Sequence, residues 1–246
     1  MNSMKTRLTE YPAMKAHRTP TPIVCTVDVV LLTLKESTLQ VLLLKREQAP
    51  FAGAWALPGG FVHADVDADT QESAARVLKE KVGIASPYLE QLATFSGLAR
   101  DPRGWSIAVT YCALVSFDEL QAALAEDVER ASQLQLCDVD ALPQLPFDHA
   151  GIVDAAVARV RSKSLYSSLP VFLCGPEFTL PQLQQTYEAV LGESVNKVSF
   201  RRKMDELDML EAVPGAMRGG AAHRPAQLYR LRTEFRRSLS LLERGL

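Results

Sequence analysis

The fold is decided by two stretches of the chain, Trp55-Ala-Leu-Pro-Gly-Gly-Phe-Val62 and Arg76-Val-Leu-Lys-Glu-Lys-Val-Gly-Ile84. Glycine and proline punctuate the first stretch, which is typical of a short strand followed by a loop. The second lies in a helix that is predicted to open at Asp69, because Glu72 then completes the pattern of a capping box. Gly83 predicts where this helix ends, since glycine is favoured just after the last helical residue.

Apolar runs on both sides of this helix predict the strands of a sheet. The four predicted strands are Ile23–Leu34, Leu39–Lys45, Tyr88–Ala99 and Ser106–Phe117. The short turn between the first two favours a hairpin. With helices predicted at Asp118–Ala125 and Asp148–Lys163, this part of the chain is expected to be an α/β domain.

The chain has 246 residues, 47% of them hydrophobic and 23% charged, which suits one large or two medium globular domains. No apolar run approaches the ~18 residues that a membrane helix needs, and the N-terminus lacks the apolar core of a secretory signal. The four cysteines are far apart and include no C-x-x-C pair. We therefore expect a cytoplasmic protein with no membrane contact and no zinc site.

The formal net charge of −2 hides an uneven distribution of charge. Residues 1–20 have a net charge of +3, residues 21–158 of −10, and residues 159–246 of +5. Basic ends around an acidic middle indicate that the ends meet a polyanion. Scattered solvated charge is the alternative that composition leaves open.

A second domain is expected after Ser164–Gly175, a segment that breaks the preceding pattern. Two helices and two strands are predicted there: Thr179–Gly192, Asn196–Leu207, Glu211–Val213 and Gln227–Arg232. A glycine-rich loop separates the strands, and a final helix is expected over Thr233–Arg244. Helix, turn, helix and small hairpin is the order of a winged helix-turn-helix, which binds DNA.

The second of these helices has the pattern of a DNA-recognition helix. Phe200, Met204 and Leu207 repeat at helical spacing and predict an inward stripe, which leaves Arg201 and Arg202 on another face. Arginine can donate two hydrogen bonds to guanine, and basic side chains hold phosphates. This face is therefore suited to the major groove.

Surface ion pairing is the alternative for the same helix, between Arg201 and Asp205 and between Arg202 and Glu206. Each such pair contributes only a few tenths of a kcal/mol. The clustering of basic residues in the helix, the wing and the N-terminal arm favours DNA. The candidate DNA contacts are Asn196, Lys197, Ser199, Arg201, Arg202, Lys203, Arg218, Arg224, Lys5, Arg7 and Arg18.

The two stretches quoted first resemble a Nudix box. The family pattern is Gly, five residues, Glu, seven residues, then Arg-Glu-apolar-x-Glu-Glu-x-Gly-apolar, and five residues match it: Arg76, Leu78, Glu80, Gly83 and Ile84. The spacing from Gly60 to Arg76 is two residues longer than the pattern, and the upstream Glu is missing near Val66–Ala68. Val77 and Lys81 replace two glutamates of its core.

Positions 77, 80 and 81 share one helical face, which in active relatives holds Mg²⁺ through carboxylates. Only Glu80 remains, beside the Lys81 ammonium, whereas Mg²⁺ prefers oxygen ligands with charge compensation. We therefore expect no bound metal, no catalytic residues and weak or no diphosphate hydrolysis. Asp65, Asp67 and Asp69 do not complete a calcium loop, but one of them could replace a lost glutamate and leave residual activity.

Arg100-Asp-Pro-Arg-Gly-Trp-Ser-Ile107 and Phe147–His149 resemble stretches of the ADP-ribose-handling Nudix branch. Arginines suit a diphosphate because guanidinium groups bind it in a bidentate manner, and aromatic rings suit either adenine or the core. His149 is expected to form structural hydrogen bonds. The candidate ligand contacts are Arg46, Trp55, Gly59, Gly60, Phe61, Arg76, Glu80, Arg100 and Arg103.

A degenerate Nudix box followed by Phe200-Arg-Arg-Lys203 in a winged helix resembles the NrtR family, Nudix-related repressors of NAD-metabolism genes. The resemblance implies an α+β Nudix sandwich, with a mixed sheet between helices, and a C-terminal winged helix-turn-helix. It also implies ADP-ribose or a related nucleotide as effector, no required cofactor, a homodimer and a palindromic double-stranded operator. The expected parts are a basic arm (1–20), a Nudix-like ligand-binding domain (21–164) and the DNA-binding domain (165–246).

Two other functions stay open at this point. The first is an active or residually active Nudix ADP-ribose pyrophosphatase, against which Val77 and Lys81 argue. The second is a ligand-binding module whose winged helix docks another protein. A hydrolysis assay with Mg²⁺ separates the first from a repressor, and a mobility shift with promoter DNA separates the second.

Overall fold

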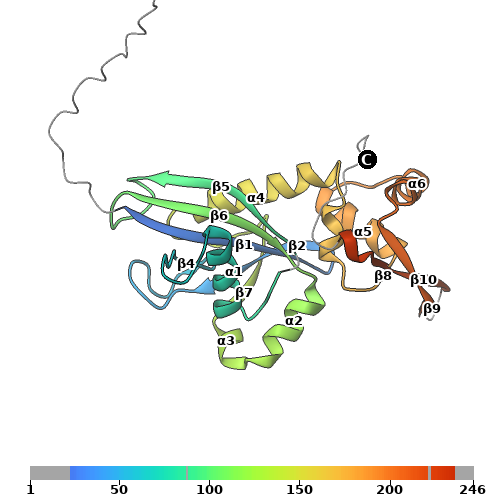
Figure 1. Ribbon diagram of the computed structural model, residues 1–246, viewed down its shortest axis with the longest axis horizontal. Helices are drawn as coiled ribbons and strands as arrows, with labels where there is room; N and C mark the ends of the chain where they lie inside the picture. The colour runs from blue at the N-terminus through green and yellow to red at the C-terminus, as the bar shows by residue number, and fades with distance from the viewer. Residues whose placement is uncertain (1–22, 87, 221–222, 236–246) are drawn as a thin grey trace, which may run out of the picture.

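The computed structural model describes residues 23–86, 88–220 and 223–235 (Figure 1). The predicted arm contacts Lys5, Arg7 and Arg18 lie outside these residues, as does the predicted last helix beyond residue 235. The described start of that helix is a short 3-10 helix, η2 (Thr233–Phe235). None of the described helices is both long enough and apolar enough to span a lipid bilayer.

A mixed seven-stranded sheet forms the first part of the described chain. Its path is β3-β2-β1-β6-β5, with β4 paired to β1 and β7 paired to β2. β1 and β6 are parallel, whereas the other pairs are antiparallel, including the predicted hairpin of β1 and β2. The strands are β1 (Val24–Lys35), β2 (Thr38–Lys45), β3 (Trp55–Ala56), β4 (Gly59–Phe61), β5 (Tyr88–Gly97), β6 (Ser106–Leu114) and β7 (Leu134–Asp138).

Helices cover both faces of this sheet, and β1 shows why (Figure 1). Val27, Val29 and Leu31 pack on one face with α1 and α2, while Val30 and Leu32 pack on the other with α4. A strand buried on both faces needs no polar alternation, which explains its continuous apolar run. The helices of this part are α1 (Thr70–Lys81), α2 (Phe117–Glu126), α3 (Val128–Ser132) and α4 (His149–Ser164).

The remaining elements form a winged helix at one end of the sheet (Figure 1). They are η1 (Leu169–Leu173), β8 (Phe178–Thr179), α5 (Leu180–Leu191), α6 (Lys197–Leu207), β9 (Leu210–Gly220) and β10 (His223–Leu231). The three strands pair in the order β8-β10-β9. Thr179 and Gln182 form the predicted capping box of α5, and Gly192 follows its last turn with a φ of 75°.

One hydrophobic cluster runs through both parts of the molecule. Ile152 of α4 belongs to the same buried cluster as Tyr187 of α5 and Phe200 of α6. The Tyr187 hydroxyl donates to the Ser167 carbonyl oxygen at 2.9 Å, which ties α5 to the segment that follows α4. Buried side chains of α4 and of the winged helix therefore pack in one continuous cluster.

Three local features differ from the predicted elements. The pattern did not predict α3 or β7, because five-residue elements with few buried side chains carry little periodicity. Ser116 caps α2, so the predicted strand ends at Leu114 and the helix begins at Phe117. The prediction of a loop after Glu211–Val213 is wrong, because backbone pairing with β10 carries β9 on to Gly220.

Candidate functional site

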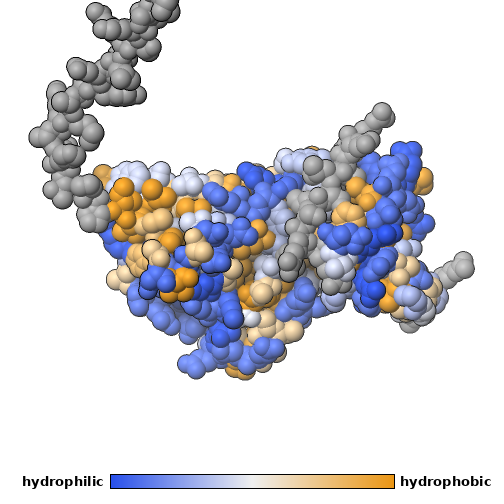
Figure 2. Space-filling view, viewed as in Figure 1, coloured by the Kyte–Doolittle hydropathy of each residue, from blue (hydrophilic) through white to orange (hydrophobic). Residues whose placement is uncertain are grey.

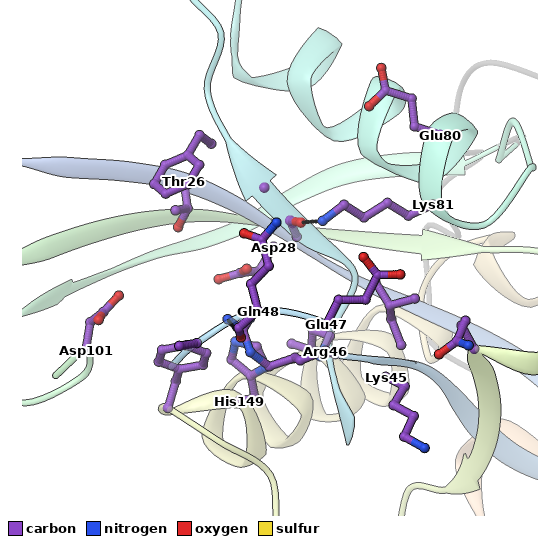
Figure 3. A pocket seen from close by; sticks show the side chains of 18 of the residues that line it. Thr26, Asp28, Lys45, Arg46, Glu47, Gln48, Glu80, Lys81, Asp101 and His149 are labelled. Carbon is purple, nitrogen blue, oxygen red and sulfur yellow. Dashed lines mark hydrogen bonds between the residues drawn. The ribbon is translucent and has the colours of Figure 1, made fainter. Parts of the chain in front are cut away.

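A cavity of about 600 Å³ opens beside α1, where β1 and β4 meet the loops that follow β2 and β5 (Figure 3). This volume is in the range of small-molecule sites. Seven of the nine predicted ligand contacts line it: Arg46, Gly59, Gly60, Phe61, Glu80, Arg100 and Arg103. Trp55 and Arg76 are not among the lining residues, and Trp55 packs instead against the hydrophobic core.

The cavity wall also contains Asp28, which was absent from the predicted contacts. Asp28 in β1 is the register partner of Gly59 in β4, and a Cβ on Gly59 would lie 2.2 Å from Asp28 Oδ1. Only glycine therefore lets the two strands approach here. Burial raises the pKa of Asp28, while His149 and Arg100 oppose that rise. The available signal was a carboxylate inside the apolar run of β1, because a buried charge needs a partner.

Arg100 lies in the cavity wall but is held by other side chains. Its Nε and Nη2 each donate to Asp148 at 2.9 Å, and its Nη1 donates to Ser106 Oγ at 3.1 Å. Its Nη2 also lies 3.6 Å from Asp28 Oδ2. With 8% of its side chain exposed, Arg100 is placed to hold the wall together, and a bidentate contact to a ligand would have to break these bonds.

Arg103 and Arg46 each lie over an aromatic ring in the cavity, Phe61 at 5.6 Å and Phe147 at 5.0 Å from the ring centre. Arg103 is also paired with Asp101 at 2.7 Å, and this pairing lowers the pKa of Asp101. Arg46 Nε donates to a backbone carbonyl of its own loop at 2.9 Å. Within the described chain, Arg46 forms no ion pair with a carboxylate.

Arg76 clamps the loop before α1 and does not reach the cavity. Its Nε and Nη2 donate to the two Asp67 oxygens at 2.7 and 2.8 Å, and its Nη2 donates to the Phe61 carbonyl oxygen at 3.0 Å. Arg76 also lowers the pKa of Asp67, which accepts two further hydrogen bonds from Ser73 and the His63 N–H. Asp67 of the acidic loop is thus the ion-pair partner of Arg76.

The face of α1 that would carry metal ligands has Val77 and Lys81 where the Nudix pattern has glutamates. Val77 is 1% exposed and packs on Gly60, where a Cβ would lie 3.3 Å from the Val77 Cγ2. Glu80 lies at the rim of the cavity with 58% of its side chain exposed, and its Oε2 is 3.4 Å from Arg76 Nη1. Lys81 extends into the cavity and donates to a backbone carbonyl of β4. The described residues include no group of three His, Cys, Asp or Glu side chains suited to a metal.

His149 begins α4 and joins it to the loop before β4. Its Nδ1 accepts a hydrogen bond from the Leu57 N–H at 3.0 Å. Burial lowers the pKa of His149 and so favours the neutral ring, and the hydrogen bond from Leu57 assigns its proton to Nε2. The structural role predicted for His149 is confirmed.

The basic residues of α6 lie away from the core. Phe200 and Met204 are 0% and 2% exposed, which confirms the inward stripe. Arg201 and Arg202 are exposed, on a surface that is largely hydrophilic in Figure 2. Arg202 forms the predicted surface pair with Glu206 at 3.5 Å, whereas Arg201 forms no ion pair within the described chain.

The first turn of α6 combines a cap with exposed side chains. Asn196 Oδ1 accepts from the N–H groups of Val198 and Ser199 at 3.1 and 3.0 Å, so this predicted DNA contact is already used as the helix cap. Lys197 and Ser199 are exposed, and Lys203 in the next turns is half-buried. Val198 lies among them as an exposed apolar side chain, with 77% of its surface accessible. Charge patterning could not indicate Val198, because it carries none.

The predicted wing is the far end of the β9–β10 hairpin. Arg218 in β9 is exposed, and its Nη1 donates to Gln182 Oε1 at 3.1 Å, at the start of α5. Arg224 lies in β10, and its side chain is outside the described part of the structure. The hairpin therefore brings Arg218 next to the start of α5.

Two family models match the chain, the NUDIX domain over residues 25–156 and the NrtR DNA-binding winged helix domain over residues 170–231. A protein of Acinetobacter baylyi described as an ADPR responsive transcriptional repressor is 41% identical over 213 residues, which are 86% of this chain and 82% of that protein. The chain belongs to the NrtR family.

Further relatives show how the NrtR fold is composed. The crystal structure of Shewanella oneidensis NrtR complexed with a 27mer DNA matches with a TM-score of 0.83 and 37% identity, over 90% of this chain and 99% of that one. An ADP-ribose pyrophosphatase of Methanocaldococcus jannaschii is 35% identical over 118 residues, which are 48% of this chain and 66% of that enzyme. The predicted fold, a Nudix domain followed by a winged helix, is confirmed.

Proposed function

We propose that this chain is a transcriptional repressor of NAD biosynthesis or salvage genes, whose Nudix domain senses ADP-ribose or a related metabolite of NAD. The proposal is carried by two sites on one hydrophobic core: a nucleotide-sized cavity with an altered metal face, and an exposed basic recognition helix. The name of the Acinetobacter baylyi relative describes the same response. A ligand that moves α4 would reach α5 and α6 through that core.

The DNA partner we propose is a palindromic duplex bound by a homodimer. One recognition helix contacts only a few base pairs, which are too few to define a unique binding site in a genome. In this proposal residues 165–246 bind DNA, and Lys197, Ser199, Arg201 and Arg202 face the major groove. The wing holds phosphates, and the basic arm of residues 1–20 adds contacts in the minor groove.

A mobility-shift titration with promoter DNA and ADP-ribose tests this function. We expect DNA binding without nucleotide, and a five- to 150-fold change in affinity when ADP-ribose is added, which is the usual size of a coupling between sites. The double variant Arg201→Ala/Arg202→Ala is the control, because it should lose DNA binding and keep ADP-ribose binding. If the chain does not bind promoter DNA, with or without ADP-ribose, the proposal is contradicted.

Hydrolysis of ADP-ribose is the second candidate function, favoured by the likeness to the Methanocaldococcus jannaschii enzyme. We infer that turnover here is weak or absent, because Val77 and Lys81 stand where the Nudix pattern has carboxylates. Product analysis with Mg²⁺ measures it directly. Turnover above about 1 s⁻¹, an ordinary enzyme rate, contradicts this inference.

A further inference from the structure

The donor set beside the cavity does not fit the divalent cation that the Nudix fold implies. Mg²⁺ needs near-octahedral oxygen ligands and charge compensation. At the two replaced positions of α1 the structure has the buried side chain of Val77 and the ammonium of Lys81. The carboxylate that remains on this face of α1, Glu80, is 58% exposed and lies beside Arg76. Other carboxylates line the cavity, among them Asp28 and Glu47, but in the described chain they form no group of three that could hold a metal ion.

The Lys81 ammonium occupies a defined place in the cavity. It reaches from the last turn of α1 to β4 and donates to the Gly59 carbonyl oxygen, as the dashed line in Figure 3 shows. A lysine ammonium has three donors, so two remain for other partners. Burial and the nearby charge of Arg46 lower the pKa of Lys81, while the charges of Asp28, Glu80 and Glu47 oppose this.

Arg46 and Lys81 differ in their partners from Arg100 and Arg103, which also line the cavity. Arg100 is bound to Asp148 and Arg103 to Asp101, whereas neither Arg46 nor Lys81 forms an ion pair with a carboxylate in the described chain. Two partly desolvated cations that face one cavity repel each other, and an anion between them relieves both the repulsion and the desolvation.

From this arrangement we propose that Lys81 stands in place of the divalent cation and, with Arg46, holds the diphosphate of the nucleotide, so that this chain binds its ligand without metal. The inference rests on the proposed function, since it assumes that the ligand is a nucleoside diphosphate such as ADP-ribose. The charges match, because a diphosphate diester carries two negative charges and the two side chains carry two positive ones.

Calorimetry of ADP-ribose with the full chain, in EDTA and in Mg²⁺, tests the inference. The unmodified chain should give the same Kd in both buffers. Lys81→Gln should weaken binding about tenfold or more in both, since it removes a charge-assisted hydrogen bond to the ligand. Lys81→Glu should abolish binding in EDTA and recover part of it in Mg²⁺. Lys79→Gln is the matched control, because Lys79 is exposed on the same helix and does not line the cavity.

The outcomes separate this inference from the proposed function. Binding by the unmodified chain that requires Mg²⁺ overturns the inference and leaves ADP-ribose as the effector. Unchanged affinity in a folded Lys81→Gln variant overturns it as well. A chain that binds no ADP-ribose in either buffer overturns the effector and the inference together. The two-buffer comparison needs no variant, so it decides the question even if a substitution prevents folding.

Discussion

Arg100 in the cavity wall and the arginines of the recognition helix are held in opposite ways. Arg100 is 8% exposed in its side chain and bound to Asp148 by two hydrogen bonds of 2.9 Å. Arg202, on α6, is 71% exposed and only 3.5 Å from Glu206, and its neighbour Arg201 forms no ion pair in the described chain. The hydrogen bonds of Arg100 fix the geometry of its side chain, whereas the charges of Arg201 and Arg202 remain available to a binding partner.

This difference matches what each surface would bind. A small ligand is held best by groups that are already in position, because ordering them on binding would cost affinity. A DNA backbone carries regular charge, and side chains on an exposed helix adjust to it at little cost in desolvation. Stability should therefore depend on the pairs that hold the cavity, and DNA binding on the exposed residues of α6.

The largest effect is expected at the contact between β1 and β4. In Gly59→Ala the new Cβ would lie 2.2 Å from Asp28 Oδ1 and 2.9 Å from the Val27 carbonyl oxygen, which belongs to the backbone and cannot move away. We expect a loss of about 3 kcal/mol in the free energy of unfolding, measured by chemical denaturation. Gly151→Ala is the control, because nothing lies within 4 Å of a Cβ there. An equally stable Gly59→Ala chain would show that β4 does not press against β1.

The next effect compares the two classes of ion pair directly. Asp148→Asn removes the carboxylate that accepts two hydrogen bonds from the buried guanidinium of Arg100 and leaves only Asp28 at 3.6 Å, so it should lower the free energy of unfolding by about 2–3 kcal/mol. Glu206→Gln removes the partner of Arg202, where both side chains are largely exposed, and should change stability by about 0.5 kcal/mol or less. Similar losses in the two variants would contradict the contrast between the cavity and α6.

Local signals in the sequence predicted much of the fold and of the helix surface. The capping patterns at Asp69 and Thr179 marked where α1 and α5 begin, although the reciprocal box forms only at Thr179, because the Glu72 side chain accepts from the Ala68 N–H. The spacing of Phe200 and Met204 predicted which face of α6 is buried. These features are set within one or two helical turns.

Long-range contacts in the cavity could not be predicted in the same way. Arg100 meets a carboxylate 48 residues later, and the role of Gly59 depends on a side chain in another strand. Charge alone gave Arg76 and Arg100 the same candidate role, and only the fold shows which acidic residue each arginine reaches. Short elements such as α3 were missed because they have no period to detect.

Loss of base recognition is the third effect. Arg201→Ala removes the exposed arginine that has no ion-pair partner in the described chain, and should reduce the preference for operator over scrambled DNA by about 1–2 kcal/mol. The expected fall is in preference, because a base contact distinguishes sequences while a phosphate contact does not. Binding to both duplexes at fixed salt measures it. A full operator preference in Arg201→Ala would place base recognition on another residue of α6, such as Val198.

The smallest effect is expected in the wing, and it tests charge without base recognition. Arg218 is exposed and bonded to Gln182, an uncharged partner, so its positive charge is available to a phosphate at little cost. Loss of one phosphate contact lowers the slope of log affinity against log salt by about one unit. Arg218→Ala should therefore weaken binding to operator and scrambled DNA alike, by less than Arg201→Ala changes the preference between them.

Arg230→Ala is the matched control, because Arg230 lies on the same hairpin and is paired with Glu211 at 2.6 Å. Titrations at several salt concentrations separate the possibilities. If the slope stays unchanged in Arg218→Ala while stability falls slightly, the bond to Gln182 is the whole role of Arg218, and the wing does not contact the phosphates through it.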